Sequence, residues 1–244
     1  MAYQLHYWPG IQGRGEFVRL AFETAGAEYV DVARDGKTGM QQMMRVLDQD
    51  APIARPPFAC PFLVDGKRVI GQSAAILLYL GPRLGLVPAG EADRLWVHQI
   101  QLTIADTVTE VHDVHHPIGS SLYYEDQQAE ALRRAADFRK NRLPKFMRWF
   151  ETVLERNPVN DTRAVPRLVG GRLSYADLSL FQLVDGLLYA FPKATKRVLK
   201  KAPLVAALHE GVPKQRRLAA YLASERRLAF NEQGIFRRYP ELDG

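Results

Sequence analysis

The stretch Tyr3-Gln-Leu-His-Tyr-Trp-Pro-Gly-Ile-Gln-Gly-Arg-Gly-Glu16 decides how the first part of the chain folds. Residues 3–8 predict a strand, because aromatic residues and Leu stand among polar ones, and the proline and glycines that follow predict a turn. From Glu16 the spacing of apolar residues predicts a helix, which Gly26 is placed to end. The sequence therefore predicts a strand, a turn and a helix whose amino end faces back toward Tyr7.

This arrangement suits the stabilisation of an anion, because a helix start offers unpaired N–H groups and a partial positive charge. For a thiolate, lowering the thiol pKa by about two units takes about 2.7 kcal/mol. One hydrogen bond to a charged acceptor contributes about 1.5–3 kcal/mol, and a helix end adds about 0.3–1 kcal/mol. A hydrogen bond from a tyrosine hydroxyl at position 7, together with the helix start, therefore supplies about the free energy that this pKa shift requires. The alternative is that Tyr7 is a half-buried strand aromatic.

The composition is that of an ordinary soluble globular protein, with 244 residues, 47% hydrophobic and 25% charged. This length suits one large domain or two small ones. No apolar run approaches the roughly 20 residues that cross a membrane, so we expect no membrane segment. The net charge of +6 is spread out. We interpret its densest groups, Lys193–Lys201 and Lys214–Arg227, as solvated helix faces rather than as a nucleic-acid surface.

Cys60 is the only cysteine, so no internal disulfide can form and a reducing compartment is expected. The amino end does not predict a secretory signal, because charged residues interrupt it before an apolar segment forms. We therefore expect a cytoplasmic protein. The mildly basic charge favours a small anionic substrate.

Residues 28–80 predict a second strand, a hairpin and a helix. Residues 28–31 read as a short strand, and residues 36–50 as an irregular helix and loop before a proline-rich segment. Asp65-Gly66 predicts an antiparallel hairpin within residues 60–70. An alanine- and leucine-rich helix follows, with Ser73 at its cap or in its first turn. The order strand, helix, strand, hairpin, helix is that of a thioredoxin-like domain, in which the proline equivalent to Pro61 is cis.

The second half predicts only helices. Residues 81–90 are rich in turn formers and are interpreted as a linker. Apolar periodicity predicts helices over residues 92–113 and 127–154, the latter kinked or divided at Pro144. Ser174-Tyr-Ala-Asp177 has the form of a capping box before the apolar run 178–188, and a last helix is expected near residues 214–222. The predicted fold is an α/β thioredoxin-like domain, residues 1–82, followed by an all-α domain, residues 91–244.

The motifs resemble those of the cytosolic glutathione transferase family over essentially the whole chain. The similarity rests on Leu5-His-Tyr-Trp8 with Gly13-Arg-Gly-Glu16, on Cys60-Pro61, on Gln72-Ser73 and on the capping box. The opening motif is most similar to the tyrosine-type classes, especially sigma, with a mu-like Tyr-Trp pair.

The resemblance implies that Tyr7 donates its hydroxyl to the glutathione sulfur and that Arg14 favours the thiolate electrostatically. It further implies a set of glutathione-binding residues: Trp8, Cys60, Pro61, Gln72, Ser73 and Asp106. The family commonly has a Trp and a Lys in the second-helix region for the glycyl carboxylate, where Met43, Met44 and Arg45 lie here, so Arg45 or Arg55 would have to hold that group. A second departure is Phe58-Ala59, which stands in place of a Gly-Lys or similar pair before the cis-proline. The carboxy-terminal extension, Phe230–Tyr239, either closes over the acceptor site or packs on the surface.

Three other patterns point to different chemistry. His112, His115 and His116 have helical spacing that suits a metal, but Pro117 follows and no cysteine is near. We instead expect them near the mouth between the domains, with Tyr123 and Tyr124, and expect no metal. Cys60 is interpreted as a packed residue rather than a nucleophile. The glycines of residues 10–15 have the wrong spacing for a dinucleotide loop.

The sequence thus predicts a glutathione S-transferase that uses glutathione as co-substrate against hydrophobic electrophiles, as a homodimer, with no nucleic-acid or membrane partner. Two alternatives remain. The same fold can carry glutathione-dependent peroxide reduction, dehalogenation or isomerisation, or it can serve as a binding protein without activity.

Overall fold

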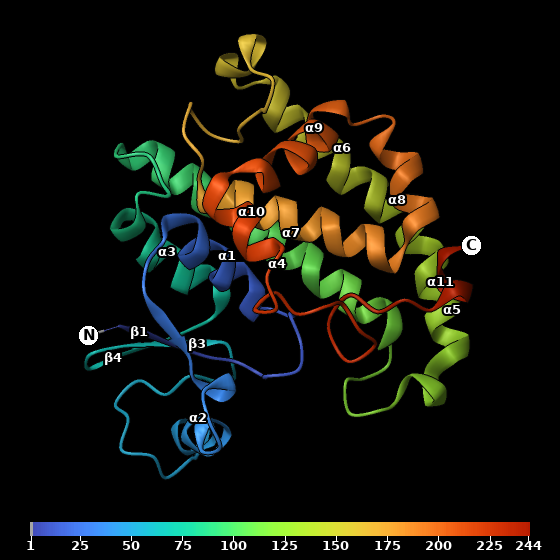
Figure 1. The fold of residues 1–244 in the computed structure, drawn as a ribbon. Coiled ribbons are helices and arrows are strands. Elements are labelled where there is room, and N and C mark those ends of the chain that lie inside the picture. The colour runs from blue at the N-terminus through green and yellow to red at the C-terminus, as the bar shows by residue number, and fades with distance from the viewer. Residues whose placement is uncertain (1) are drawn as a thin grey trace.

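The computed structural model describes residues 2–244, and its amino-terminal half is built on a four-stranded sheet of order β2-β1-β3-β4 (Figure 1). The strands are β1 (Tyr3–His6), β2 (Tyr29–Asp31), β3 (Phe62–Asp65) and β4 (Arg68–Gly71). β2 runs parallel to β1, with Val30 opposite Gln4, and β3 runs antiparallel, with Leu63 opposite Leu5. The predicted strands and the hairpin at Asp65-Gly66 are confirmed.

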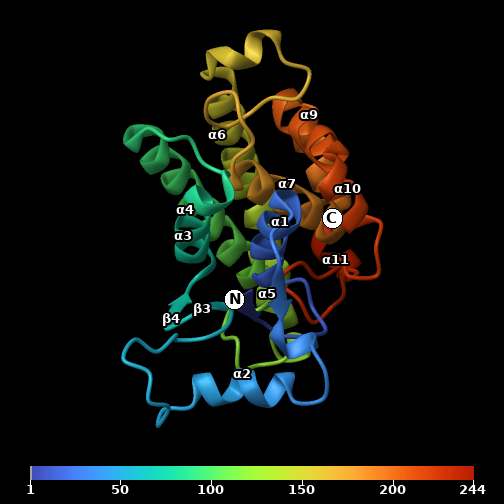
Figure 2. The same ribbon diagram turned by 60° about the vertical axis from the view of Figure 1, so that its left-hand side comes forward.

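Three helices cover the two faces of this sheet: α1 (Gly15–Ala25), α2 (Gly39–Leu47) and α3 (Ser73–Leu84). Figure 2 shows α1 and α3 on one side of the sheet and α2 on the other. Side chains alternate along a strand, so Leu63 packs under α1 and α3 while its neighbour Phe62 packs with Met43 of α2. Gly26 ends α1 in a left-handed conformation at φ 68°, as predicted.

The second half is entirely helical. Its α-helices are α4 (Glu91–His115), α5 (Gln128–Asp137), α6 (Leu143–Glu155), α7 (Tyr175–Ala190), α8 (Pro192–Leu199), α9 (Pro203–Gly211), α10 (Arg216–Leu222) and α11 (Pro240–Asp243). Short 3₁₀ turns lie at η1 (Val32–Arg34), η2 (Tyr124–Gln127), η4 (Pro158–Thr162) and η5 (Val212–Lys214), and η3 (Phe138–Arg142) is a π-helical turn. The predicted fold class is confirmed.

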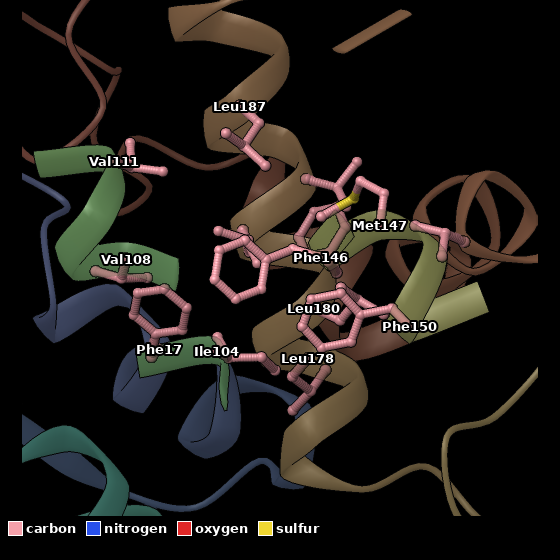
Figure 3. Close-up of a cluster of buried hydrophobic side chains, with 14 of the residues drawn as sticks. Phe17, Ile104, Val108, Val111, Phe146, Met147, Phe150, Leu178, Leu180 and Leu187 are labelled. Atoms are coloured by element: carbon pink, nitrogen blue, oxygen red, sulfur yellow. The ribbon is translucent and has the colours of Figure 1, made fainter. Parts of the chain in front are cut away.

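The two halves share one hydrophobic core. Figure 3 shows Phe17 of α1 beside Ile104 and Val108 of α4, with side chains of α6 and α7 completing the cluster. α7 lies at the centre, because its apolar run has hardly any polar face. The sheet half is therefore held against the helical half by α1, the helix that follows the Tyr7 turn.

The capping box that begins α7 forms as predicted. The Asp177 N–H donates to Ser174 Oγ at 3.3 Å, and the Ser174 N–H donates to Asp177 Oδ2 at 2.7 Å. The Leu168 N–H also donates to Asp177 Oδ1 at 2.8 Å, so this carboxyl joins the preceding loop to the helix. Burial raises the pKa of Asp177, and these hydrogen bonds oppose that rise.

Element boundaries differ from the prediction at three places. α3 continues through Gly81-Pro82 to Leu84, so the linker begins later than expected. The N–H that Pro82 lacks would have bonded to the carbonyl of Leu78, whose side chain is 45% exposed, and water can satisfy that group. The region expected to be irregular, residues 36–50, contains the regular helix α2. Pro144 lies in the first turn of α6, after the π-helical turn that divides α5 from α6.

The division into domains at residues 82 and 91 stays a prediction. No helix within residues 2–244 combines the length and the apolar character needed to cross a membrane.

Candidate active site

Tyr7 lies just after β1, with its ring against the turn that leads into α1. Its hydroxyl oxygen accepts a hydrogen bond from the Arg14 backbone N–H at 2.8 Å. Two glycines make room for the ring: a Cβ at Gly13 would lie 2.7 Å from Cε1 and Cζ of Tyr7, and one at Gly15 would lie 2.6 Å from Cγ. Gly13 also has φ +45°. The helix start therefore faces Tyr7 as the sequence predicted.

The tyrosine hydroxyl is protonated at neutral pH. Burial raises the pKa of Tyr7, which is 4% exposed, while the Arg14 N–H and the guanidinium groups of Arg14 and Arg19 oppose the rise. Because the oxygen accepts the Arg14 N–H, the hydroxyl proton is free to be donated elsewhere. The turn thus presents a phenol whose oxygen is fixed in place and whose proton can serve an anion.

A cavity of about 310 Å³ adjoins this turn, and Arg14, Gln72 and Ser73 are part of its wall. Ser73 Oγ donates to the Arg14 carbonyl oxygen at 3.2 Å, which joins the start of α3 to the start of α1. Gln72 has φ +66°, a left-handed backbone conformation that is unusual for a residue with a side chain. Two helix amino ends therefore border one cavity, and both favour an anionic group.

The rest of this cavity wall comes mainly from apolar side chains of α1, α3 and α4: Phe17, Leu78, Leu102, Ile104 and Val108. His98 and Gln101 add polar atoms that sequence reasoning missed. Gln101 is buried, and its Oε1 has no hydrogen-bond partner within residues 2–244. The only sign of Gln101 in the sequence was that a polar residue stands among apolar ones in the segment that forms α4.

Trp8 and Cys60 lie together beside the Tyr7 turn. The Cys60–Pro61 peptide bond is cis, as expected. Burial raises the pKa of the Cys60 thiol, although the N–H groups of Cys60 and Trp8 near the sulfur oppose that rise. A thiol with a raised pKa is a weak nucleophile at neutral pH, which favours the packed interpretation of Cys60. Trp8 itself is 39% exposed.

Asp106 stands apart from these groups. It is exposed on α4 and does not form part of the cavity wall, although its neighbour Ala105 does. The structure thus brings Arg14, Gln72 and Ser73 to one cavity and places Tyr7 against the Arg14 N–H and Cys60 beside Trp8, whereas Asp106 faces solvent in the single chain.

A buried polar network fixes the far side of the turn, and the sequence did not predict it. Glu16 and Arg19 are both fully buried and form an ion pair at 3.2 Å. Tyr221 donates to Glu16 at 2.7 Å, and Arg227 also pairs with Glu16. The amide of Gln182 donates to Gln12 Oε1 at 2.8 Å. Charged residues on the apolar helix α1 were the only signal in the sequence.

The carboxy-terminal segment packs over the end of α4. His115 Nε2 lies 2.7 Å from the Ile235 carbonyl oxygen, and the rings of Tyr124 and Tyr239 stack with centroids 3.8 Å apart. The extension buries His115 and Tyr124, while the expectation that these side chains lie near the mouth between the domains stays a prediction. Tyr123 is 78% exposed.

Burial lowers the pKa of His115 to about 3 and that of His116 to about 4. Burial also lowers the pKa of His112, a hydrogen bond with Asp113 opposes the fall, and the positive charge of Arg14 adds to it. Within residues 2–244, no group of three or more His, Cys, Asp or Glu side chains has an arrangement that could hold a metal ion.

Comparison with known proteins agrees with this architecture. Residues 112–225 match the family model described as "Glutathione S-transferase, C-terminal domain". The chain is 24% identical to a glutathione S-transferase of Plasmodium falciparum (isolate 3D7), over 90% of this chain and 95% of that protein. It is 26% identical to glutathione S-transferase P 1 of Xenopus laevis, over 92% and 93% of the two chains.

Among solved structures, the Pi-class glutathione S-transferase of Onchocerca volvulus has the same fold, with a TM-score of 0.67 and 23% identity over 91% of this chain and 92% of that one. A four-stranded sheet joined to a helical half is the architecture that this chain shares with that structure. In sequence and in fold, the chain is similar to glutathione S-transferases.

Proposed function

We propose that this protein is a glutathione S-transferase in which Tyr7 stabilises the thiolate of bound glutathione for attack on a hydrophobic electrophile. The observation that carries the proposal is the Tyr7 hydroxyl, held at 2.8 Å by the Arg14 N–H with its own proton free. Bound sulfur beside this oxygen receives one charge-assisted hydrogen bond, worth about 1.5–3 kcal/mol. That range covers the about 2.7 kcal/mol that a two-unit fall in the thiol pKa requires.

The remaining glutathione contacts follow from the positions around the cavity. Gln72 and Ser73, at the start of α3, hold the γ-glutamyl carboxylate, since a helix amino end and a hydroxyl both favour an anion. The Cys60 backbone before cis-Pro61 pairs with the cysteinyl part of the tripeptide, and Trp8 contacts the peptide. The guanidinium of Arg14 adds positive charge near the sulfur.

The acceptor is hydrophobic, because the wall toward α4 is largely apolar. We also propose that the protein is cytoplasmic. We place it closest to the sigma class, with mu-like features, on the strength of the opening motif Leu5-His-Tyr-Trp8 with Gly13-Arg-Gly-Glu16. The relatives that are named for other classes are only about a quarter identical to this chain, so their names do not decide its class. The assignment therefore rests on the opening motif.

We further propose a homodimer formed through α3, α4 and the loop before β3. Large apolar side chains are exposed there: Leu78, Leu95 and Leu102 are 45%, 64% and 47% exposed, and Phe58 is 96% exposed. Exposed apolar side chains grouped on adjoining elements are typical of an interface. Asp106 lies on the same helix, from which it reaches the γ-glutamyl amino group of glutathione bound to the other subunit.

The test is Tyr7→Phe, assayed with glutathione and a chloroarene. We expect turnover to fall about ten- to a hundredfold, equivalent to about 1.4–2.7 kcal/mol, and the pKa of the bound thiol to rise. Tyr3→Phe is the matched control, because Tyr3 is a tyrosine of β1 whose ring packs on Phe22. An unchanged thiolate titration in Tyr7→Phe would refute the role of Tyr7.

The same assays separate the alternatives. A hydroperoxide turned over in place of the chloroarene indicates a peroxidase on this fold. Binding of glutathione with no turnover on a broad panel of electrophiles indicates a binding protein.

A further inference from the structure

The segment between α10 and α11, residues 223–239, is bonded to the turn that carries Tyr7. In Figure 1 this tail is red and runs from α10 to α11 at the other end of the helical half. The side-chain amide of Gln12, in the turn, donates to the carbonyl oxygen of Leu228, which lies 216 residues further along the chain. The tail is therefore attached to the start of the proposed active site.

Two buried glutamines connect the turn, the tail and α7. Gln182 of α7 donates from its side-chain amide to Gln12 Oε1 at 2.8 Å, and Arg227 of the tail donates to Gln182 Oε1 at 3.0 Å. Arg227 and Leu228 are neighbours in the tail, so these bonds close a ring with the one from Gln12. Each glutamine thereby has a partner for both its amide nitrogen and its amide oxygen, as a buried amide requires.

The two ends of this ring fix the direction in which each amide points. A carbonyl oxygen can only accept, so Gln12 turns its N–H toward Leu228 and its oxygen toward Gln182. A guanidinium can only donate, so Gln182 turns its oxygen toward Arg227 and its N–H toward Gln12. The ring thus has a single arrangement of donors and acceptors, and neither amide can be removed without breaking it.

Gln12 is anchored by its backbone as well. Its carbonyl oxygen accepts from the Glu16 N–H at 3.0 Å and from Arg19 Nη1 at 3.2 Å. Two residues after Gln12 stands Arg14, whose N–H donates to the Tyr7 hydroxyl oxygen at 2.8 Å. The place of the hydroxyl therefore depends on how firmly the turn is held at Gln12.

Asn231 gives the tail a second contact with the turn. Its side-chain amide donates to the Gly10 carbonyl oxygen at 2.9 Å, while its side-chain oxygen accepts from the Gln233 N–H at 3.0 Å. The tail thus holds the turn at two points, Gly10 and Gln12.

We propose that Gln182 is a positioning residue of the transferase reaction, which acts through Gln12 on the turn that presents the Tyr7 hydroxyl. Arg227 and Asn231 of the tail support the same turn. None of these last two or Gln182 belongs to the wall of the cavity of about 310 Å³, so their action on the chemistry passes through the turn. The inference rests on the proposed function, because it concerns the hydroxyl that meets the sulfur of glutathione.

The test compares Gln182→Leu with a matched substitution far from the turn. Gln182→Leu removes two hydrogen bonds of a buried amide. Asn157→Leu is the control, because Asn157 is also buried and donates to the carbonyl oxygens of Arg167 at 2.9 Å and Gly170 at 3.0 Å. Both substitutions leave the net charge unchanged, and both should lower stability in urea. Loss of stability therefore cannot account for a difference between them.

For Gln182→Leu we expect kcat to fall about tenfold and the pKa of the bound thiol to rise by about one, because the hydroxyl is no longer held opposite the sulfur. The KM for glutathione should change less than kcat, since Gln72 and Ser73 lie outside the turn. Asn157→Leu should keep the kcat and the thiol pKa of the unmodified protein. Equal values of both quantities in the two variants would overturn the proposal.

Asn231→Ala decides the question if Gln182→Leu does not fold. Asn231 is only half-buried, so its replacement should be tolerated, and it removes the bond to Gly10 without adding a charge. We expect kcat to fall about threefold and the thiol pKa to rise, for the loss of one hydrogen bond in the turn. A thiol pKa equal to that of the unmodified protein would then count against the proposal.

Tyr7→Phe separates this inference from the proposed function. If Tyr7→Phe leaves the pKa of the bound thiol unchanged, the proposed function fails and the inference fails with it. If Tyr7→Phe raises that pKa and Gln182→Leu does not, the inference alone fails.

Discussion

Replacing Gly13 by alanine tests whether the position of the Tyr7 hydroxyl controls the proposed chemistry. Because Gly13 has no side chain, replacing it removes none of the side-chain contacts proposed for glutathione. An added Cβ would lie 2.7 Å from Cε1 and Cζ of Tyr7 and nearer still to its hydroxyl oxygen. The substitution therefore acts on the proposed chemistry by displacing the ring of Tyr7.

The size of the displacement follows from these distances. Non-bonded carbon atoms settle about 3.5–4.0 Å apart, so the ring must retreat by about 1 Å from its present 2.7 Å approach. The Arg14 N–H then loses its 2.8 Å hydrogen bond to the hydroxyl. A displacement of about 1 Å can reduce turnover about a hundredfold, equivalent to about 2.7 kcal/mol. Alanine at φ +45° also costs about 1–2 kcal/mol of folding stability.

The assay compares kcat/KM with a chloroarene and the pKa of the bound thiol, read from thiolate absorbance. Gly10→Ala is the matched control in the same turn, since a Cβ there meets no atom within 4 Å. We expect Gly13→Ala to lose turnover and to raise the thiol pKa, while Gly10→Ala behaves as the unmodified protein. Equal kcat/KM and thiol pKa in the two variants would refute the reasoning, because the tyrosine would then tolerate displacement.

Three further predictions concern stability. Asp177→Ala should lower the free energy of unfolding by about 2–4 kcal/mol in urea, since it leaves buried N–H groups without acceptors; a loss below about 1 kcal/mol would contradict this. Because burial lowers the pKa of His115 to about 3, the unfolded chain binds the extra proton first as the pH falls below about 6.5. Stability should therefore decrease toward pH 4 by up to about 1.4 kcal/mol per unit for this histidine, and His115→Gln should show a shallower slope in urea titrations at several pH values. Arg227→Ala should lower the free energy of unfolding by about 2–4 kcal/mol, because Glu16 is fully buried and loses a partner. The neighbouring Arg226→Ala breaks an exposed pair and should cost less than about 1 kcal/mol, so equal losses in the two variants would contradict the buried network.

The amino-terminal site was largely predictable because its parts are close in sequence. The spacing from Tyr7 to Arg14 places a helix start opposite a strand end, and the glycines between them permit the close approach. Gln72 and Ser73 follow a hairpin whose Asp65-Gly66 turn fixes where the next helix begins. Short-range geometry of this kind leaves few arrangements open.

The carboxy-terminal extension was not predictable in the same way. Its residues lack helical or strand periodicity, so the sequence allowed both a cover over the acceptor site and a surface-packed tail. The structure shows it burying His115 and Tyr124 and touching the Tyr7 turn, where Asn231 donates to the Gly10 carbonyl oxygen at 2.9 Å. Hydrogen bonds to a remote backbone leave no repeating pattern in the chain.

By itself the sequence determined the order of the strands and helices in the amino-terminal half, the cap of α7 and the Tyr7 turn. These depend on neighbouring residues, through backbone conformation and apolar periodicity. Only the tertiary structure decided that Gln182 meets Gln12, that Arg227 reaches Glu16 and that Trp96 packs edge to face on Trp149. An apolar pattern shows that a helix face is buried but does not name the helix that buries it. Contacts between distant segments arise from the angles and separations at which whole helices pack.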